Sequence, residues 1–341
     1  MTLRVNLRDV AKAAGVSPAT ADRVLNNREG VRARTREVVL DAARRLGYVT
    51  DADTRTGGIP SPVDLVFLLP SGTNSFIHML HQQIALQAAD RLELRVRVEV
   101  LEGLNPAWVA TRLLELKGKA SGVGIVAQDH PLVREAVRAL ADGGTAVVTL
   151  ASDVQNVPRI AYVGIDNRQA GRLAGHLLGR ILLPQTSAKV ALFAGSLSYR
   201  GHEEREMGFR HILRDEFPGM RIVDLRETHD DRDRARTGTL ALLQDHPDVA
   251  AIYNLGGATQ GIAQALASQG RAGKIALIGH ELTEGNKALL LDGTVDVIID
   301  QNPRVEAREA LNILTHAVRG QAYRYVAPRI QLIFRENIPA D

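Results

Sequence analysis

Hydrophobic residues recur at two different periods along this chain, and the change of period divides it into two parts. Over residues 6–49, apolar side chains recur every three or four positions, which is the spacing of one helix face. From Val63 onward, short apolar runs typical of buried strands alternate with segments of helical period. The pattern therefore predicts an all-helical N-terminal part, followed by a longer part in which strands and helices alternate.

The N-terminal part contains signals for three short helices. Asn6 can cap the first helix, with Asp9 in its opening turn, where a carboxylate suits the exposed amides. Gly15 permits a tight turn after this helix, because glycine has no Cβ to hinder such a backbone. Ser17 is a good N-cap for a second helix that begins at Pro18, where the missing N–H of proline is no loss.

A third helix is predicted from about Ala33 to Leu46, ending at Gly47. Apolar residues at helical spacing are expected to form one small core: Leu7, Val10, Ala11, Ala14, Ala21, Val24, Leu25, Val38, Val39, Ala42 and Leu46. Four residues of the second helix are expected to face outward: Ala19, Thr20, Asp22 and Arg23. Two short helices joined at a glycine, the second opening with Ser-Pro, form a helix-turn-helix.

Basic charge is concentrated in this helical part. Residues 1–50 contain ten Lys and Arg against five Asp and Glu, a net charge of +5, whereas the whole chain carries +3. A small bundle with solvated charges is the alternative, since most helix pairs do not bind DNA. Positive charge gathered in one helical unit is what contact with phosphates requires, so the stretch is predicted to bind DNA.

Length and composition limit what the rest of the chain can be. With 341 residues, the chain is long enough for two or three domains, and 45% hydrophobic against 24% charged residues is typical of globular proteins. The absence of cysteine excludes disulfides, thiolate metal sites and a cysteine nucleophile. There is no signal-peptide pattern and no apolar run of about 18 residues, so we expect a cytoplasmic protein with no membrane partner.

The helical stretch contains three motifs in a distinctive order and spacing: Leu7-x-Asp9-Val10-Ala11-x-x-Ala14-Gly15-Val16-Ser17-x-x-Thr20, Arg23-Val24-Leu25-Asn26 and Leu46-Gly47-Tyr48. With these motifs, it resembles the DNA-binding domain of the lactose-repressor (LacI/GalR) family of transcriptional regulators. The resemblance implies a DNA-binding domain over residues 1–49 and an operator of double-stranded DNA.

The resemblance also implies roles for individual residues of the second helix. Pro18 and Ala19, with Arg23 one turn later, take the places that read base edges in the major groove. Three further residues match positions that usually touch phosphates: Ser17, Thr20 and Asn26. Asp22 stands where the family commonly has serine, and a carboxylate repels DNA unless it pairs with Arg23 or accepts from a cytosine amine.

Residues 50–62 form the clearest linker in the chain, because two glycines and two prolines make a poor element interior. In the resembled family, this segment often folds into a hinge helix on DNA and inserts a leucine into the minor groove. Aligned from Tyr48, the place of that leucine falls at Gly57, while Arg55 matches the arginine that precedes it. A plain flexible tether is therefore as good an interpretation of this segment as a hinge that folds on DNA.

From Val63 to the end, the pattern predicts an α/β fold. Strand-like runs occur near 63–69, 94–101, 122–126, 145–150, 160–164, 189–194, 221–225, 250–254, 275–279, 295–299 and 330–334. Helical segments between them include 75–92, 131–142, 166–181, 200–214, 257–269 and 303–319. Repeated βα units imply parallel sheets covered on both faces. About eleven strands exceed a comfortable single sheet, so two sub-domains with a cleft between them are predicted.

Motifs of catalytic chemistry are missing from the sequence. The segment 254–261 follows a strand and opens a helix, but it lacks the glycine spacing of a dinucleotide loop. The segment 195–201 is not a nucleophile elbow. His78 and His81 share a helix face but have no third ligand nearby in the sequence. We therefore expect no catalytic residue, no cofactor and no metal site.

The region from Val63 onward resembles the effector domain of the same family, which is similar to a periplasmic sugar-binding protein. The likeness is strongest at residues 164–171 and at the motif Arg205-x-x-Gly208-Phe209. It implies one lobe of about residues 63–163 and 300–325, and another of about 164–299 and 326–341. Such domains bind a small molecule at the carboxyl ends of strands, in the crevice between the lobes.

Carried over by position, the resemblance assigns polar and aromatic residues at successive strand ends to an effector site: Asn74, Phe76, Asp166, Asn167, Arg205, Asn254, Glu281 and Gln301. Each of them taken alone also fits a turn or a helix cap. Arg205 matches the arginine that usually grips the ligand, and Glu281 stands where an aspartate is usual.

Other positions depart from the usual sugar binder. Ala151 occupies the place of a common aspartate, with Ser152 and Asp153 directly after it. His229 and Asp230 lie where a stacking aromatic residue is common. Asp129, which follows a strand, either projects into the cleft or caps a helix. Asp153, His229 and Asp129 are therefore counted among the candidate effector-binding residues.

The sequence thus predicts a ligand-responsive transcription factor, a homodimer whose symmetry matches a palindromic operator. No leucine heptad follows the last strand, which favours a dimer over a tetramer. The candidate site holds several carboxylates against one well-placed cation, Arg205, so we expect a neutral sugar or polyol as effector. Repression released by the effector is the family's commoner mode. A periplasmic solute-binding protein and a cytoplasmic α/β enzyme acting on a sugar are the alternatives.

Overall fold

The structure, a computed structural model, describes residues 6–25, 30–46, 62–72, 74–101, 105–182 and 187–339. Internal contacts divide the chain into two units, Met1–Pro62 and Val63–Asp341. Five positions singled out in the sequence lie outside the described residues: Asn26, Gly47, Tyr48, Arg55 and Gly57. The predictions that concern them therefore stay predictions.

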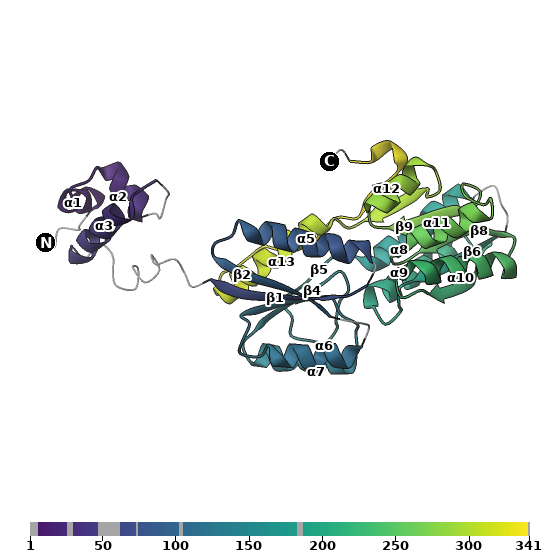
Figure 1. Ribbon diagram of the computed structural model, residues 1–341, viewed down its shortest axis with the longest axis horizontal. Coiled ribbons are helices and arrows are strands. Elements are labelled where there is room, and N and C mark those ends of the chain that lie inside the picture. The colour runs from purple at the N-terminus through teal and green to yellow at the C-terminus, as the bar shows by residue number, and fades with distance from the viewer. Residues whose placement is uncertain are drawn as a thin grey trace. The chain divides into compact units, whose positions relative to one another are not determined.

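The N-terminal unit contains the three predicted helices, α1 (Leu7–Ala13), α2 (Pro18–Leu25) and α3 (Ala33–Arg45) (Figure 1). Asn6 accepts hydrogen bonds from the amides of Arg8 and Asp9, while Asp9 accepts one from the Asn6 amide. This reciprocal capping box satisfies amides that an uncapped helix end leaves without partners. The predicted start of the first helix is confirmed.

The core of this unit follows the helical period with one exception. Val10, Ala21, Val24 and Ala42 are buried together, as the apolar spacing predicts. Val38 is 44% exposed, so its assignment to the core was wrong. Core positions of α3 recur at 39, 42 and 43, and a residue one step away from such a stripe is rotated by about 100° toward solvent.

The second unit contains two separate sheets, as the number of strands predicts (Figure 1). The first has the order β2-β1-β3-β4-β5, and all its neighbours are parallel. Its strands are β1 (Val63–Pro70), β2 (Leu94–Leu101), β3 (Gly122–Ile125), β4 (Ala146–Leu150) and β5 (Ala161–Val163).

The second sheet has the order β11-β10-β9-β8-β6-β7, and only β11 runs antiparallel to its neighbour. Its strands are β6 (Ala188–Ala194), β7 (Met220–Glu227), β8 (Val249–Asn254), β9 (Ala276–His280), β10 (Val297–Asp300) and β11 (Gln331–Ile333). The predicted two-lobed α/β fold is confirmed, with β11 as the one departure from parallel pairing.

Helices cover both faces of each sheet. On the first sheet, α5 (Ser75–Ala89) and α13 (Pro303–Val318) cover one face, and α6 (Pro106–Glu115) and α7 (Pro131–Asp142) the other. Alternate residues of β1 explain this arrangement, because Leu65 and Phe67 pack with α5 and α13 whereas Val66 and Leu68 pack with α6 and α7.

On the second sheet, α8 (Asn167–Ile181) and α9 (Arg200–Glu216) cover one face. The other face is covered by α10 (Arg232–Asp245), α11 (Thr259–Ser268) and α12 (Glu284–Leu291). A short 3-10 helix, Arg335–Asn337, follows β11. Of these elements, α6, α10 and α12 were not singled out from the sequence. None of the described helices combines the length and apolar character that crossing a membrane requires.

The chain passes from one lobe to the other between β5 and α8, between β10 and α13, and between α13 and β11. The segment after β10 contains Gln301 and Asn302, so both residues lie between the two lobes. Parallel strands present their carboxyl ends at one edge of a sheet, and the loops that follow them supply the residues of a site.

Candidate functional site

A cavity of about 290 Å³ lies at the carboxyl ends of strands from both lobes. The first lobe lines it with Pro70, Ser71, Gly72, Asn74, Phe76, Ile77, Val126, Ala151 and Ser152. The second lobe contributes Gly195, Tyr199, Gly201, His202, Arg205, His229, Asp230, Gly256, Gly257 and Glu281, and Gln301 lies on the crossing segment. The volume is near the lower end of the range typical of small-molecule sites, roughly 300–1,000 Å³.

The backbone around the cavity adopts unusual conformations. Ala151 (φ 54°), His229 (φ 54°), Asp230 (φ 55°) and Glu281 (φ 69°) line the cavity in the left-handed region. A side chain in this region costs of order 1–3 kcal/mol, and such residues persist only where the surrounding structure holds them. Left-handed residues other than glycine cluster at binding sites, so their gathering here is typical of such a site.

Arg205 is the buried cation of the cavity. Its Nε donates to Asn167 Oδ1 at 2.8 Å and its Nη1 donates to the carbonyl oxygen of Leu255 at 2.6 Å. Nη2 lies 3.8 Å from Glu281 Oε1, beyond hydrogen-bond distance. The guanidinium is therefore held through Nε and Nη1, while its Nη2 lies beside the Glu281 carboxyl.

Close packing of two helices gives Arg205 this position. A Cβ at Gly171 of α8 would lie 1.9 Å from the carbonyl oxygen of Arg205 on α9. A Cβ at Gly208 would meet the carbonyl oxygen of Arg168 at 2.1 Å. Both glycines belong to the motifs that carried the family resemblance, and their physical role is to let the backbones of α8 and α9 touch.

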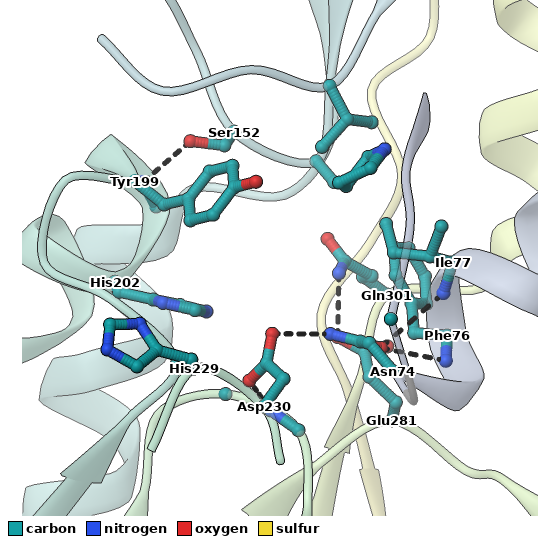
Figure 2. Close-up of a pocket in the computed structure, with 18 of the residues that line it drawn as sticks. Asn74, Phe76, Ile77, Ser152, Tyr199, His202, His229, Asp230, Glu281 and Gln301 are labelled. Carbon is teal, nitrogen blue, oxygen red and sulfur yellow. Dashed lines mark hydrogen bonds between the residues drawn. The ribbon is translucent and has the colours of Figure 1, made fainter. Parts of the chain in front are cut away.

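Glu281 and Gln301 form the second polar group of the cavity. Gln301 Nε2 donates to Glu281 Oε1 at 2.6 Å (Figure 2). Burial, and after it the nearby Asp300, raise the pKa of the Glu281 carboxyl to about 8, although Arg205 and the hydrogen bonds from Gln301 oppose them. Glu281 is therefore mostly protonated at neutral pH. Glu281 Oε2 and Gln301 Oε1 are buried and have no hydrogen-bond partner among the described residues.

Asp230 is the carboxylate of the cavity and joins its two walls. Its Oδ1 accepts from the Gly257 amide at 2.7 Å, and its Oδ2 accepts from Asn74 Nδ2 at 2.9 Å (Figure 2). A Cβ at Gly195 would lie 2.3 Å from Asp230 Oδ1, and one at Gly256 would lie 2.7 Å away. Only glycine at these two places leaves room for the carboxylate.

Burial also favours the uncharged forms of two neighbouring side chains, those of His202 and Tyr199. Burial lowers the pKa of the His202 imidazole, although the Asp230 carboxylate opposes this effect. Burial raises the pKa of the Tyr199 phenol. The positive charge of the buried Arg205 is thus opposed by the carboxylate of the half-buried Asp230.

The helix-turn-helix presents the outward face that the sequence predicts. Ser17, Pro18 and Ala19 are exposed at the start of α2, and Arg23 is exposed in its last turn. Ser17 Oγ accepts a hydrogen bond from the Thr20 amide at 3.1 Å, which caps the helix. The first turn of α2 and Arg23 are therefore open to a partner.

Two parts of the chain match known protein families. Residues 6–51 match the bacterial regulatory proteins of the lacI family, and residues 109–322 match the periplasmic binding protein domain. This chain belongs to the lacI family. The resemblance read from the sequence is thereby confirmed. The family consists of transcriptional regulators, so the interpretation as an enzyme is set aside.

Individual relatives of this lacI-family protein include regulators and a sugar-binding protein. It is 34% identical over 111 residues to the sucrose operon repressor of Escherichia coli, covering 26% of this chain and 34% of that one. It is 26% identical over 215 residues to the catabolite control protein A of Priestia megaterium, covering 62% and 61%. It is 27% identical over 198 residues to the D-ribose/D-allose-binding protein of Pseudomonas aeruginosa, covering 56% and 60%.

The chain thus spans about three fifths or less of the length of these curated relatives. Among solved structures, the lacI-family chain is similar to GanP, a glucose-galactose binding protein from Geobacillus stearothermophilus. The TM-score is 0.74 at 24% identity, covering 82% of this chain and 99% of that one. This likeness supports the two-lobed fold.

The cavity is lined by six of the candidate effector-binding residues from the sequence: Asn74, Phe76, Arg205, His229, Glu281 and Gln301. Asn167 and Asn254 do not line it but support residues that do. Asn167 holds Arg205, and Asn254 Nδ2 donates to the Gly257 carbonyl oxygen at 2.7 Å, which shapes the loop beside Asp230.

Three of the expected carboxylates lie outside the cavity lining, because each has found a local partner. Asp129 pairs with Arg134 through two hydrogen bonds of 2.6 and 2.8 Å. Asp153 accepts from Thr149 Oγ1 and pairs with Arg159. Asp166 caps α8 by accepting from the Gln169 amide.

Several lining residues were not singled out in the sequence. Asp230 and Ser152 were noted beside His229 and Ala151 but not chosen. Tyr199 and His202 were missed. His202 precedes Arg205 by three residues on α9 and so shares its helix face, and that spacing was the available signal for it. Tyr199 is the N-cap residue of α9.

Proposed function

We propose that this protein is a ligand-responsive transcriptional regulator that acts in the cytoplasm. Its helix-turn-helix binds double-stranded DNA, and a small neutral polyhydroxylated molecule, a sugar or a cyclic polyol, binds in the cavity between the lobes. A homodimer presents two helix-turn-helix units to a palindromic operator. The effector releases repression, as is common in the family.

The arrangement around Arg205 is the observation that carries this proposal. A guanidinium with Nη2 available lies beside two buried oxygens that lack partners among the described residues, Gln301 Oε1, which accepts, and Glu281 Oε2, which carries the proton of the neutral carboxyl and donates. Buried polar atoms without partners are unfavourable, so a fitting ligand must bring hydroxyl groups, which both donate and accept. Hydroxyl and ring oxygens in turn accept from the guanidinium.

The balance of charge in the cavity supports a neutral effector. Arg205 is opposed by the Asp230 carboxylate, so an anionic ligand would gain one attraction and meet one repulsion in a partly dry site. Sugar recognition by relatives is consistent with this view, since their names include a D-ribose/D-allose-binding protein and a sucrose operon repressor.

Coupling of the effector to DNA requires two arrangements of the protein with different affinity for each ligand. The cavity is formed by both lobes, and Gln301 lies on a segment that passes between them. A ligand that touches both walls therefore favours one spacing of the lobes over another.

Calorimetry with a panel of sugars, cyclic polyols, sugar acids and sugar phosphates tests the proposal. A neutral member is expected to bind, and Arg205→Ala is expected to abolish that binding while operator affinity survives. Arg205→Lys serves as a matched control that keeps the charge but loses the fork-shaped donor, and it should retain only weak binding. Selective tight binding of an acid or a phosphate, with neutral compounds inert, would overturn the proposal.

A further inference from the structure

The two walls of the cavity differ in chemistry. From the first lobe come five apolar side chains, those of Pro70, Phe76, Ile77, Val126 and Ala151, and no charged one. Figure 2 shows Phe76 and Ile77 together on this side of the cavity. The wall from the first lobe therefore offers a ligand mainly apolar contact.

The polar side chains of the first lobe already have partners. Asn74 Oδ1 accepts from the amides of Phe76 and Ile77, and its Nδ2 donates to Asp230. Ser152 Oγ accepts from the Gly201 amide at 3.2 Å. Hydroxyl groups of a ligand are consequently better served by the second lobe and the crossing segment, where Arg205, Glu281 and Gln301 lie.

A small hollow of about 10 Å³ adjoins the apolar wall. Pro70, Val126 and Tyr199 line both the hollow and the cavity, and the fully buried Leu69 and Val133 line the hollow alone. The hollow has about the minimum size that admits one water molecule, but a buried water needs two to four polar partners. Gln128 and Tyr199 are the polar members of the lining, and its other eight residues are apolar, so the hollow suits a methyl group better than a water molecule.

We infer that the effector is a deoxysugar, in its simplest form a 6-deoxyhexose. Its hydroxyl edge faces Arg205, Glu281 and Gln301, and its methyl group enters the hollow beside Val126. This inference rests on the proposed function, whose ligand it narrows. An ordinary hexose also has a C–H face that can pack on Phe76, but its hydroxymethyl group would place a hydroxyl among side chains that are mostly apolar.

Calorimetry on the full-length protein with matched pairs of sugars tests the inference. The pairs are D-fucose and D-galactose, L-fucose and L-galactose, L-rhamnose and L-mannose, and 6-deoxy-D-glucose and D-glucose. In the pair that binds, the deoxy member is expected to bind at least about tenfold more tightly, because the parent sugar buries a hydroxyl without a partner.

Each other result counts against the inference in a distinguishable way. Equal or tighter binding by the parent hexose overturns the inference and leaves the proposed function intact. If other neutral polyols bind while all four pairs of sugars are inert, the inference is likewise overturned and the proposed function is left intact. Binding only of acids or phosphates overturns both.

Variants of the hollow provide a second test. Val126→Thr places a hydroxyl at its edge with almost no change of volume, and it should reduce the preference for the deoxy sugar at least threefold. Val109→Thr is a second variant that should disturb the fold less, because Val109 is partly exposed. Val109 lines the hollow but not the cavity. Val98→Thr, on β2 outside the cavity, is the matched control and should leave the preference unchanged. If a folded Val126 or Val109 variant that still binds sugar kept the same preference for the deoxy sugar over its parent hexose, the methyl group would not lie in the hollow and the inference would be wrong.

Discussion

Asn74 Nδ2 donates a hydrogen bond of 2.9 Å to Asp230 Oδ2, and this bond joins the two lobes from opposite walls of the cavity. The same Asn74 side chain caps α5 through its Oδ1. Asp230 in turn holds the Gly257 amide. One bond therefore links the first turn of a helix in one lobe to a loop in the other, so a change in the spacing of the lobes acts directly on both.

This link can be tested with Asn74→Asp. A carboxylate keeps the cap of α5, because its oxygen accepts the same amides, but it places a second negative charge against Asp230. Effector affinity is expected to fall about tenfold or more, and small-angle scattering should show more widely separated lobes. Asn105→Asp is the matched control, since Asn105 caps α6 by accepting from the Ala107 amide and does not line the cavity. Equal effects of the two changes would contradict the role of the Asn74–Asp230 bond.

Glu306 should make the stability of the protein depend on pH. It is fully buried in α13, both carboxyl oxygens lack partners among the described residues, and burial raises its pKa well above the ordinary value near 4.5. Between the ordinary and the raised pKa, the folded state binds more protons than the unfolded state, so stability falls as pH rises through this interval. Glu306→Gln removes that dependence.

Urea unfolding at pH 5 and pH 8 provides the measurement for Glu306. The glutamine variant should be more stable than the unmodified protein at pH 8, and the difference should shrink toward pH 5. Glu309→Gln is the control on the same helix, because Glu309 Oε2 accepts from the Tyr323 hydroxyl and its carboxylate pairs with Arg308. No gain at pH 8 is expected there. If the difference in unfolding free energy between Glu306→Gln and the unmodified protein were equal at pH 5 and pH 8, it would argue against a buried protonated carboxyl.

Glu281 is expected to tolerate replacement by its neutral counterpart. With a pKa of about 8, its carboxyl is mostly protonated at pH 7, and a glutamine amide likewise both donates and accepts. Glu281→Gln should therefore keep effector affinity within about threefold in calorimetry at pH 7. Asp230→Asn is the comparison, because Asp230 accepts two N–H groups, and it should lose about tenfold or more. A large loss for Glu281→Gln alone would mean that the ionised form binds the effector.

Arg23 is expected to contribute to operator binding. It is the exposed cation of α2 within the described residues, in the last turn of the helix. Arg23→Ala should weaken operator binding by about 1–3 kcal/mol, as loss of a base or phosphate contact does, while effector affinity stays intact. Fluorescence anisotropy on a mapped operator measures the affinity for DNA, and calorimetry measures the affinity for the effector. Unchanged operator affinity would show that the reading face lies elsewhere.

Local signals were sufficient for most of the elements and for part of the cavity. Asn6 and Ser17 cap helices through residues two or three positions away, so their effect can be read from sequence alone. Gln301 was found because the ends of parallel strands meet at one edge, and Arg205, which lies on α9, because the family resemblance marked its position. By contrast, α10 has a weakly segregated pattern of polar and apolar residues, and its place was not singled out.

The amino-acid sequence by itself determined the family, the two-lobed α/β fold and the helix-turn-helix, because these depend on periodicity, caps and motif spacing within short stretches. Only the tertiary structure decided which carboxylates enter the cavity. Asp129 pairs with Arg134, five residues away in the sequence, and so stays outside the cavity. Asp230 lies in a space left by Gly195 and Gly256, which come from other loops. It also decided the protonation of Glu281, because burial by elements distant in sequence, and not the residue type, sets the energy of its charged form.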